Sequence, residues 1–330
     1  MSRPAVFVTR RVPSSVVERL DQQCTVEIHD GPEAIPADEL RSRLADKQAL
    51  MCLLTDRVDG AVLDAGPGLR IVANIAVGYD NIDVAAAKAR GIVVTNTPGV
   101  LEVSVAEHAL WLIGCLARHI VAMDADMRAG RFGSRPGMEL AGKALGVIGL
   151  GAIGRRVAAM AHFGFGMEVL AADTRPLAPG ELDALKSQCG VAFYTGDVGE
   201  VLRRSDVVSA HLPAVAGTRR FFNAARFAAM KSGALFVNTA RGSIVDEAAL
   251  YDALAAGRPA GAALDVFEAE PYVPAAPDKD LRRAPNVVLT PHLASTTREA
   301  SSRMARACLE NIRHFFGGRL DQLTRVDAPS

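Results

Sequence analysis

The sequence predicts an α/β protein with two domains, each built on a doubly wound parallel sheet. Short aliphatic and β-branched runs alternate with helical stretches along the chain, which is typical of parallel sheets. A glycine-rich turn joins one of these runs to a helix. The length of 330 residues suggests about two domains. With 49% hydrophobic and 22% charged residues, the composition suits globular domains with sizeable cores.

The first hundred residues contain five expected strands with helices between them. The strands are AVFVT (5–9), TVEIH (25–29), ALMCLLT (49–55), LRIVANIAV (69–77) and IVVTNT (92–97), and the helices lie at 13–22, 36–46 and 83–90. One long helix is then expected over about 100–130, followed by a loop at 131–137.

A second series of seven strands follows from residue 144. They are ALGVIGL (144–150), MEVLAAD (167–173), VAFYT (191–195), DVVSAHL (206–212), ALFVNTA (234–240), GAALDV (261–266) and NVVLT (286–290). A final amphipathic helix at about 296–316 is too isolated to form a domain, so we expect it to pack on the first one.

Composition narrows the class of protein and its location. Lys+Arg and Asp+Glu are both 37, so charge favours neither nucleic acid nor an anionic membrane as a partner. The five cysteines are scattered without a C-x-x-C pair, which predicts reduced thiols and no metal site. Arg118 and His119 interrupt the most apolar helix, and the first residues lack a long apolar run. We therefore expect a cytoplasmic protein.

The segment from Gly142 to Asp173 has the strand–turn–helix–strand order of a dinucleotide-binding motif. Its turn reads Gly149-Leu150-Gly151-Ala152-Ile153-Gly154. Gly149 permits the tight turn, Gly151 lets the backbone approach a pyrophosphate, and Gly154 allows close packing of helix on strand. Asp173 would accept hydrogen bonds from ribose hydroxyls and repel a 2′-phosphate, which favours NAD(H) over NADP(H), although Arg175 lies nearby.

Three polar residues follow strands at the edge where doubly wound sheets bind ligands. They are Arg241, Glu270 and His292. Reduction of a 2-oxo acid needs a cation for the carboxylate, which an arginine fork provides, and a proton donor with a pKa near neutrality, which a histidine provides. A neighbouring carboxylate would hold that histidine, and the residues alone leave Glu268 as a rival to Glu270.

Several further segments carry a resemblance to a known family. They are VGYDNID (77–83), TNTPGV (95–100), VAEHAL (105–110), NTARGSIVDEAAL (238–250), ALDVFEAEP (263–271) and LTPHLAS (289–295). With the glycine turn, their order and spacing resemble the D-isomer-specific 2-hydroxyacid dehydrogenases. CLLTDRVD (52–59) and AVGYDNID (76–83) are most similar to the glyoxylate/hydroxypyruvate reductase branch.

The resemblance implies roles for individual residues. His292 would be the acid/base, Glu270 its partner, and Arg241 the substrate anchor. Leu54 and the backbone N–H groups of Val77 and Gly78 would also bind substrate. The resemblance further implies these cofactor-binding residues: Thr239 and Ala240 beside the nicotinamide, Asp265 on its carboxamide, His211, and Pro213 on the adenine side.

The resemblance also implies the domain plan and the partners. A Rossmann NAD-binding domain (101–291) would be inserted into a flavodoxin-like substrate domain (1–100 plus 292–330), with a cleft that closes on substrate. The helix at about 101–130 is apolar around much of its circumference, so we expect it to form a homodimer interface. The expected substrate is a small 2-oxo acid such as glyoxylate or hydroxypyruvate. A phosphoglycerate dehydrogenase, a phosphite dehydrogenase and an NAD-sensing corepressor-like protein remain alternatives.

Overall fold

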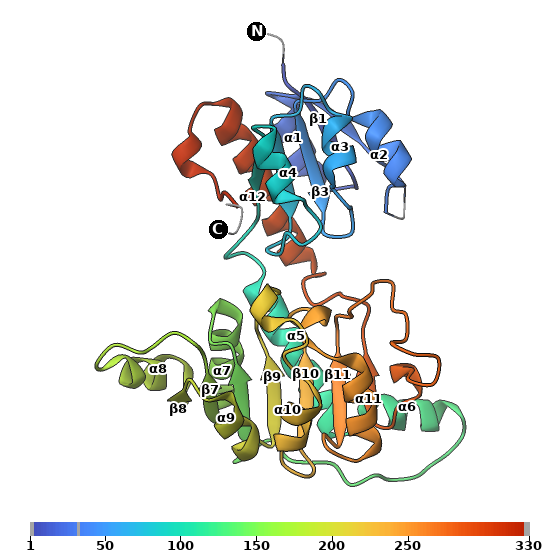
Figure 1. Ribbon diagram of the computed structural model, residues 1–330, viewed down its shortest axis with the longest axis vertical. Coiled ribbons are helices and arrows are strands. Elements are labelled where there is room, and N and C mark those ends of the chain that lie inside the picture. Colours follow the sequence, from blue (N-terminus) through green and yellow to red (C-terminus); the bar gives the residue numbers. More distant parts are fainter. Residues whose placement is uncertain (1–2, 32–33, 327–330) are drawn as a thin grey trace. The chain divides into compact units, whose positions relative to one another are not determined.

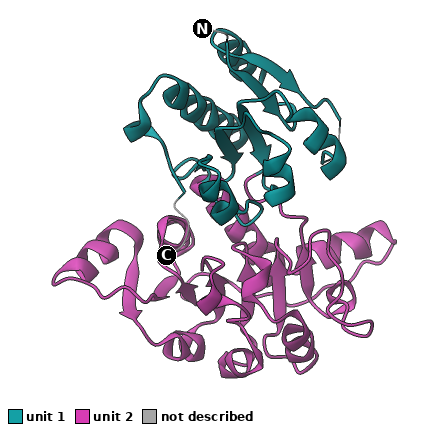
Figure 2. Ribbon diagram, turned by 45° about the horizontal axis from the view of Figure 1, so that its top comes forward, with its two compact units in different colours: residues 1–101, 296–330 teal, residues 102–295 magenta. Residues whose placement is uncertain are grey.

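The computed structural model describes residues 3–31 and 34–326 and divides into two compact units. Unit 1 contains the chain up to Leu101 and from Thr296 onward, and unit 2 contains Glu102–Ser295 (Figure 2). The sequence-based boundary lies before residue 292, whereas here residues 292–295 belong to unit 2. The reason is local, since the backbone N–H groups of Leu293 and Ala294 donate to Asp265 at 3.0 and 2.9 Å.

Unit 1 is built on a five-stranded parallel sheet in the order β2-β1-β3-β4-β5, which is the flavodoxin-like order. Its strands are β1 (Ala5–Val8), β2 (Thr25–Ile28), β3 (Ala49–Leu53), β4 (Ile71–Ile75) and β5 (Val93–Thr95). Its α-helices are α1 (Ser14–Asp21), α2 (Ala37–Arg43), α3 (Gly60–Asp64), α4 (Val84–Ala89) and α12 (Arg298–Phe316).

The C-terminal helix α12 completes unit 1, as the sequence predicts. It packs against α1 and β4, and its apolar face buries Met304, Leu309 and Ile312. On the other core layer, side chains of α2, α3 and α4 pack with alternate residues of the strands, such as Leu50 and Val72. The sequence does not predict α3, which is only five residues long.

Unit 2 is built on a seven-stranded parallel sheet in the order β12-β11-β10-β9-β6-β7-β8. After β8 the chain returns to the other side of β6, where β9 pairs. This gives the Rossmann strand order, with β12 as one additional strand at the edge. The strands are β6 (Ala144–Ile148), β7 (Glu168–Ala172), β8 (Val191–Thr195), β9 (Val207–Ala210), β10 (Leu235–Asn238), β11 (Gly261–Leu264) and β12 (Val287–Leu289). Figure 1 shows β9, β10 and β11 side by side. All twelve expected strands are therefore present.

Helices cover both faces of this sheet. One face packs against α5 (Glu102–Ala117), α7 (Ala152–Phe165) and α8 (Glu181–Cys189). The other packs against α9 (Val198–Arg204), α10 (Ala224–Ala229) and α11 (Glu247–Ala255). Successive strand residues alternate between the two layers, with Val237 on the first and Phe236 on the second. Burial on both faces explains why these strands are continuous apolar runs.

The expectation of one long helix over 100–130 is wrong. The chain forms α5 and α6 (Ile120–Arg128), which are bent by 61° at a short break. His119 lies in the break with φ of 53°, in the left-handed region, and its Nδ1 lies 3.1 Å from Asn286 Oδ1. In the described chain no single helix is long and apolar enough to cross a membrane. The bent pair α5 and α6 reaches that length and apolar composition only when its two helices are counted together.

Candidate active site

The glycine turn between β6 and α7 leaves the N-terminus of the helix open. Gly149 has φ of 94°, and a Cβ there would lie 2.5 Å from the carbonyl oxygen of His211. A Cβ at Gly154 would collide with the Gly149 carbonyl. At Gly151, the N-cap of α7, no described atom lies within 4 Å of a Cβ position. The turn therefore fits a pyrophosphate on the N–H groups of α7.

Asp173 connects the end of β7 to this turn. Its Oδ2 accepts a hydrogen bond from Leu150 N–H at 2.7 Å, and its Oδ1 accepts one from Arg175 N–H at 3.1 Å. The carboxylate is only partly buried, so it keeps an exposed side. This is the geometry of an acidic side chain that both stiffens the glycine turn and is available to ribose hydroxyls.

His211 and Pro213 follow β9 at the same edge of the sheet. The imidazole Nε2 of His211 lies 2.9 Å from Ser209 Oγ, and burial lowers the pKa of His211 to about 4. The ring is therefore neutral at pH 7. Pro213 is exposed, and its carbonyl accepts a hydrogen bond from Thr218 Oγ1 at 2.5 Å. Their assignment to the cofactor stays a prediction.

At the end of β10, Asn238 shapes the segment that carries Arg241. Its side-chain amide donates to the Arg241 carbonyl at 2.9 Å, and its Oδ1 accepts from Ala240 N–H at 3.0 Å. Thr239 is buried, and its Oγ1 has no hydrogen-bond partner within the described residues. A buried hydroxyl without a partner is costly, so a bound group that meets it would be favoured.

Gly242 brings this segment against the loop that leads to Glu270. A Cβ at Gly242 would collide with the backbone of Phe267 and Glu268, so only glycine fits. The same loop is held by Glu247, whose Oε1 accepts from Glu268 N–H at 2.7 Å. Burial raises the pKa of Glu247. Glu247 is not predicted from the sequence as a site residue, because an acidic residue at a helix start is common on surfaces.

His292 and Glu270 form a close pair. His292 Nδ1 lies 2.7 Å from Glu270 Oε2, while Glu270 Oε1 accepts from Phe267 N–H at 3.0 Å. His292 has φ of 50°, and its N–H donates to the Asp265 carbonyl at 2.7 Å. Because Nδ1 is bound to the carboxylate, Nε2 is the ring atom that can exchange a proton with a reactant.

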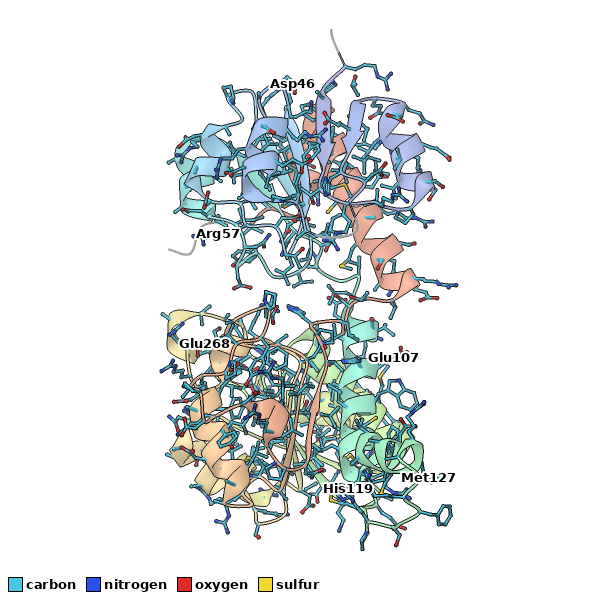
Figure 3. The ribbon with its side chains drawn as sticks, turned by 90° about the vertical axis from the view of Figure 1, so that its right-hand side faces the viewer. Asp46, Arg57, Glu107, His119, Met127 and Glu268 are labelled. Carbon is cyan, nitrogen blue, oxygen red and sulfur yellow. The ribbon has the colours of Figure 1, made fainter. Side chains whose placement is uncertain are left out.

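The rival carboxylate, Glu268, has other partners. It accepts from Arg219 at 2.7 Å and from Arg220 at 3.3 Å. The geometry thus pairs His292 with Glu270. Figure 3 shows Glu268 at the same end of unit 2 as Glu107 and opposite His119.

Asp265 fixes the segment around His292. Its side chain is fully buried, with Oδ1 accepting from Thr290 Oγ1 at 2.6 Å. Leu293 and Ala294 donate their N–H groups to the same carboxylate, as described above. His108 of α5 lies 3.4 Å from Oδ1 and 3.2 Å from Thr290 Oγ1. Burial alone would raise the pKa of Asp265, but these hydrogen bonds outweigh it and hold the pKa below its usual value.

We expect Asp265→Asn to lower the free energy of unfolding by about 2–4 kcal/mol at pH 7, because its donors lose a charged acceptor. The pKa of Asp265 is depressed in the fold, so its contribution is present above the unfolded value of about 3.9 and is lost as pH falls through the folded value. Urea unfolding at pH 7 and in acid should show the difference from wild type shrinking in acid. Asp252→Asn, on the exposed surface of α11, is the control. A difference that stays constant would contradict this role.

In unit 1, the backbone at Val77 and Gly78 is held in a fixed orientation. The carbonyl of Ala76 accepts from Thr97 N–H at 2.9 Å, and the carbonyl of Val77 accepts from Asn96 Nδ2 at 2.8 Å. In a trans peptide the N–H points away from the preceding carbonyl, so these bonds direct the N–H groups of Val77 and Gly78 to the opposite side. Leu54 is half-buried just after β3. Substrate binding by these three residues stays a prediction.

Two doubly wound parallel sheets with a glycine turn between β6 and α7 define the class of the protein, an NAD-binding oxidoreductase that acts on a CH–OH group. Residues 110–294 match the family model of the D-isomer specific 2-hydroxyacid dehydrogenase NAD-binding domain. The chain belongs to this family, as the sequence analysis expects.

Relatives support the same branch. The chain is 42% identical over 329 residues to a glyoxylate reductase of Aeropyrum pernix, covering 97% of this chain and 95% of the relative. Among solved structures it resembles an NADPH-dependent glyoxylate/hydroxypyruvate reductase from Sinorhizobium meliloti in complex with NADP and malonate (TM-score 0.81, 32% identity, covering 99% and 100%). It also resembles D-lactate dehydrogenase from Aquifex aeolicus with NAD and lactic acid (TM-score 0.81, 31% identity, covering 99% and 100%).

Proposed function

We propose that the protein is an NAD(H)-dependent D-2-hydroxyacid dehydrogenase that reduces a small 2-oxo acid such as glyoxylate or hydroxypyruvate. The observation that carries the proposal is the His292–Glu270 pair at 2.7 Å, in the unit that also contains the glycine turn and Arg241. Glyoxylate reductases at about 40% identity over nearly the whole chain support the choice of substrate.

The residues present fit a dinucleotide. The α7 N-terminus at Gly151 would hold the pyrophosphate, Asp173 the adenosine ribose, and Thr239 and Ala240 the nicotinamide side. When bound, the cofactor supplies the hydride. The fit depends on the space at Gly151 and on the buried hydroxyl of Thr239, neither of which is met by another group in the part of the chain that the structure describes.

The side chains of this protein then bind the substrate carboxylate and donate the proton. Arg241 offers a planar fork that binds a carboxylate through two parallel hydrogen bonds. His292 donates a proton from Nε2 to the oxygen that becomes the hydroxyl. Glu270 holds the ring through Nδ1 and so leaves Nε2 for that transfer. Leu54, Val77 and Gly78 are assigned to substrate binding by the family resemblance.

A panel of substrates tests the proposal. Oxidation of NADH should be measured with glyoxylate, hydroxypyruvate and pyruvate, and reduction of NAD with 3-phosphoglycerate and phosphite. Fastest turnover with glyoxylate or hydroxypyruvate would support the proposal. Preference for 3-phosphoglycerate or phosphite would favour those dehydrogenases instead. Tight NADH binding without turnover of any substrate would favour a corepressor-like sensor.

We also propose a homodimer that forms through α5, α6 and the loop after them. Apolar side chains in this region are exposed, with exposed fractions of 69% for Trp111 and 94% for Phe132. Ile120, Val121 and Met127 are also half exposed or more, and Figure 3 shows Met127 on α6. Exposed apolar side chains gathered on neighbouring segments of the chain favour an interaction site. A cytoplasmic location remains a proposal, supported by the free cysteines.

Replacing Trp111 by glutamate is expected to weaken the dimer, because a charge would be desolvated in the interface. Light scattering at micromolar concentration should give a dimer mass for the wild type and a lower mass for the variant. Val273→Glu changes a similarly exposed apolar residue elsewhere in unit 2 and should leave the dimer intact. A monomeric wild type would refute the proposal.

A further inference from the structure

The segment after β7 contains both an acidic and a basic side chain at the predicted ribose position. Asp173 follows the strand, and the Arg175 N–H donates to its Oδ1 at 3.1 Å. A carboxylate here favours NAD(H), whereas an arginine here can bind the 2′-phosphate of NADP(H). Asp173 alone therefore does not decide which coenzyme the site prefers.

The guanidinium of Arg175 is held by Glu181, the first residue of α8. Arg175 Nη1 lies 2.9 Å from Glu181 Oε2 and Nη2 lies 2.5 Å from Oε1, which is a bidentate arrangement. Glu181 Oε2 also accepts from Ala178 N–H at 3.0 Å, and the Tyr194 hydroxyl donates to the Arg175 carbonyl. Both the backbone and the side chain of Arg175 are thus held.

Glu181 remains charged across the physiological range. The hydrogen bonds from Arg175 and from Ala178 N–H lower the pKa of Glu181 to about 2. A second nearby cation, Arg155, donates through Nε to the Leu150 carbonyl at 3.1 Å. A 2′-phosphate at this position would have to replace the Glu181 carboxylate on Arg175 while facing Asp173.

We propose that Glu181 is a specificity-determining residue for the coenzyme. Its carboxylate forms a bidentate ion pair with Arg175, so the guanidinium is not available to bind a 2′-phosphate. The inference deepens the proposed NAD(H)-dependent function and rests on it. Glu181 acts through Arg175, so its removal should change recognition of the 2′-phosphate and leave recognition of the unphosphorylated ribose nearly unchanged.

Two adenosine fragments test this without turnover. Calorimetry should compare 5′-AMP with 2′,5′-ADP, which differ by the 2′-phosphate alone. In Glu181→Gln, which keeps the size of the side chain, affinity for 2′,5′-ADP should rise about tenfold, the gain expected from one charge-assisted hydrogen bond. Affinity for 5′-AMP should stay within about twofold. The ratio of kcat/KM for NADPH to that for NADH should rise in parallel.

Two further variants serve as controls. The double variant Arg175→Ala/Glu181→Gln should lose the gain, because the freed guanidinium is its source. Glu200→Gln removes a matched carboxylate, paired with Arg204 at 3.4 Å on α9, and should change neither affinity. An unchanged 2′,5′-ADP affinity in Glu181→Gln, or a gain that survives in the double variant, would overturn the inference while 5′-AMP binding still supports the proposed function. A wild type that binds neither fragment would overturn both.

Discussion

His292→Ala is expected to lower kcat for reduction of the best 2-oxo acid by about 10²–10⁴-fold, the usual contribution of a general acid. KM should change much less, because the carboxylate of the substrate is bound by other groups in the proposed mechanism. Steady-state kinetics with NADH would measure both quantities. The 2.7 Å contact with Glu270 occupies Nδ1 of His292 and leaves Nε2 to donate the proton.

Two other variants make this test specific. Glu270→Gln keeps the shape of the partner but removes its charge, so it should cause a smaller loss in kcat than His292→Ala. His314→Gln alters a histidine at the end of α12 in unit 1 and should leave the kinetics unchanged. If His292→Ala retained wild-type turnover, the acid/base assignment would be wrong.

The strands were predictable because burial on both faces requires continuous apolar runs, and those runs are visible in the sequence. The break between α5 and α6 was not predictable. Arg118 and His119 interrupt the apolar run, but two polar residues do not by themselves end a helix. The left-handed backbone at His119 accompanies a contact with Asn286, 167 residues away. A contact of that range leaves no local signal.

In the candidate site, too, some residues could be predicted from the local sequence pattern and others could not. Arg241 and His292 could be found because each follows an apolar run at a strand end. The family resemblance was needed to choose Glu270 over Glu268, because the two glutamates look alike in the sequence. They differ only in their contacts in the fold, where Glu268 forms ion pairs with Arg219 and Arg220.

His108 was missed as well. It lies in VAEHAL (105–110), but its partner Thr290 is 182 residues away, and helical periodicity alone makes it an ordinary half-buried residue.

Arg241→Ala is expected to raise KM for the 2-oxo acid by about 10²–10³-fold, since two charge-assisted hydrogen bonds to the carboxylate would be lost. The KM for NADH should change by no more than about twofold. The backbone should hold its position, because Asn238 binds the Arg241 carbonyl at 2.9 Å and Gly242 remains packed on the loop at Phe267. Arg203→Ala, which removes an exposed arginine on α9, is the matched control.

A change of substrate separates binding of the carboxylate from a general loss of structure. Glycolaldehyde presents a reducible carbonyl beside a hydroxymethyl group, where glyoxylate has its carboxylate. If Arg241 binds that carboxylate, Arg241→Ala should reduce kcat/KM strongly for glyoxylate and little for glycolaldehyde, and the preference of the wild type for glyoxylate should largely disappear. Arg241→Lys should give an intermediate value, because an ammonium keeps the charge but loses the planar fork. Equal losses for both substrates would show that Arg241 supports the site in another way.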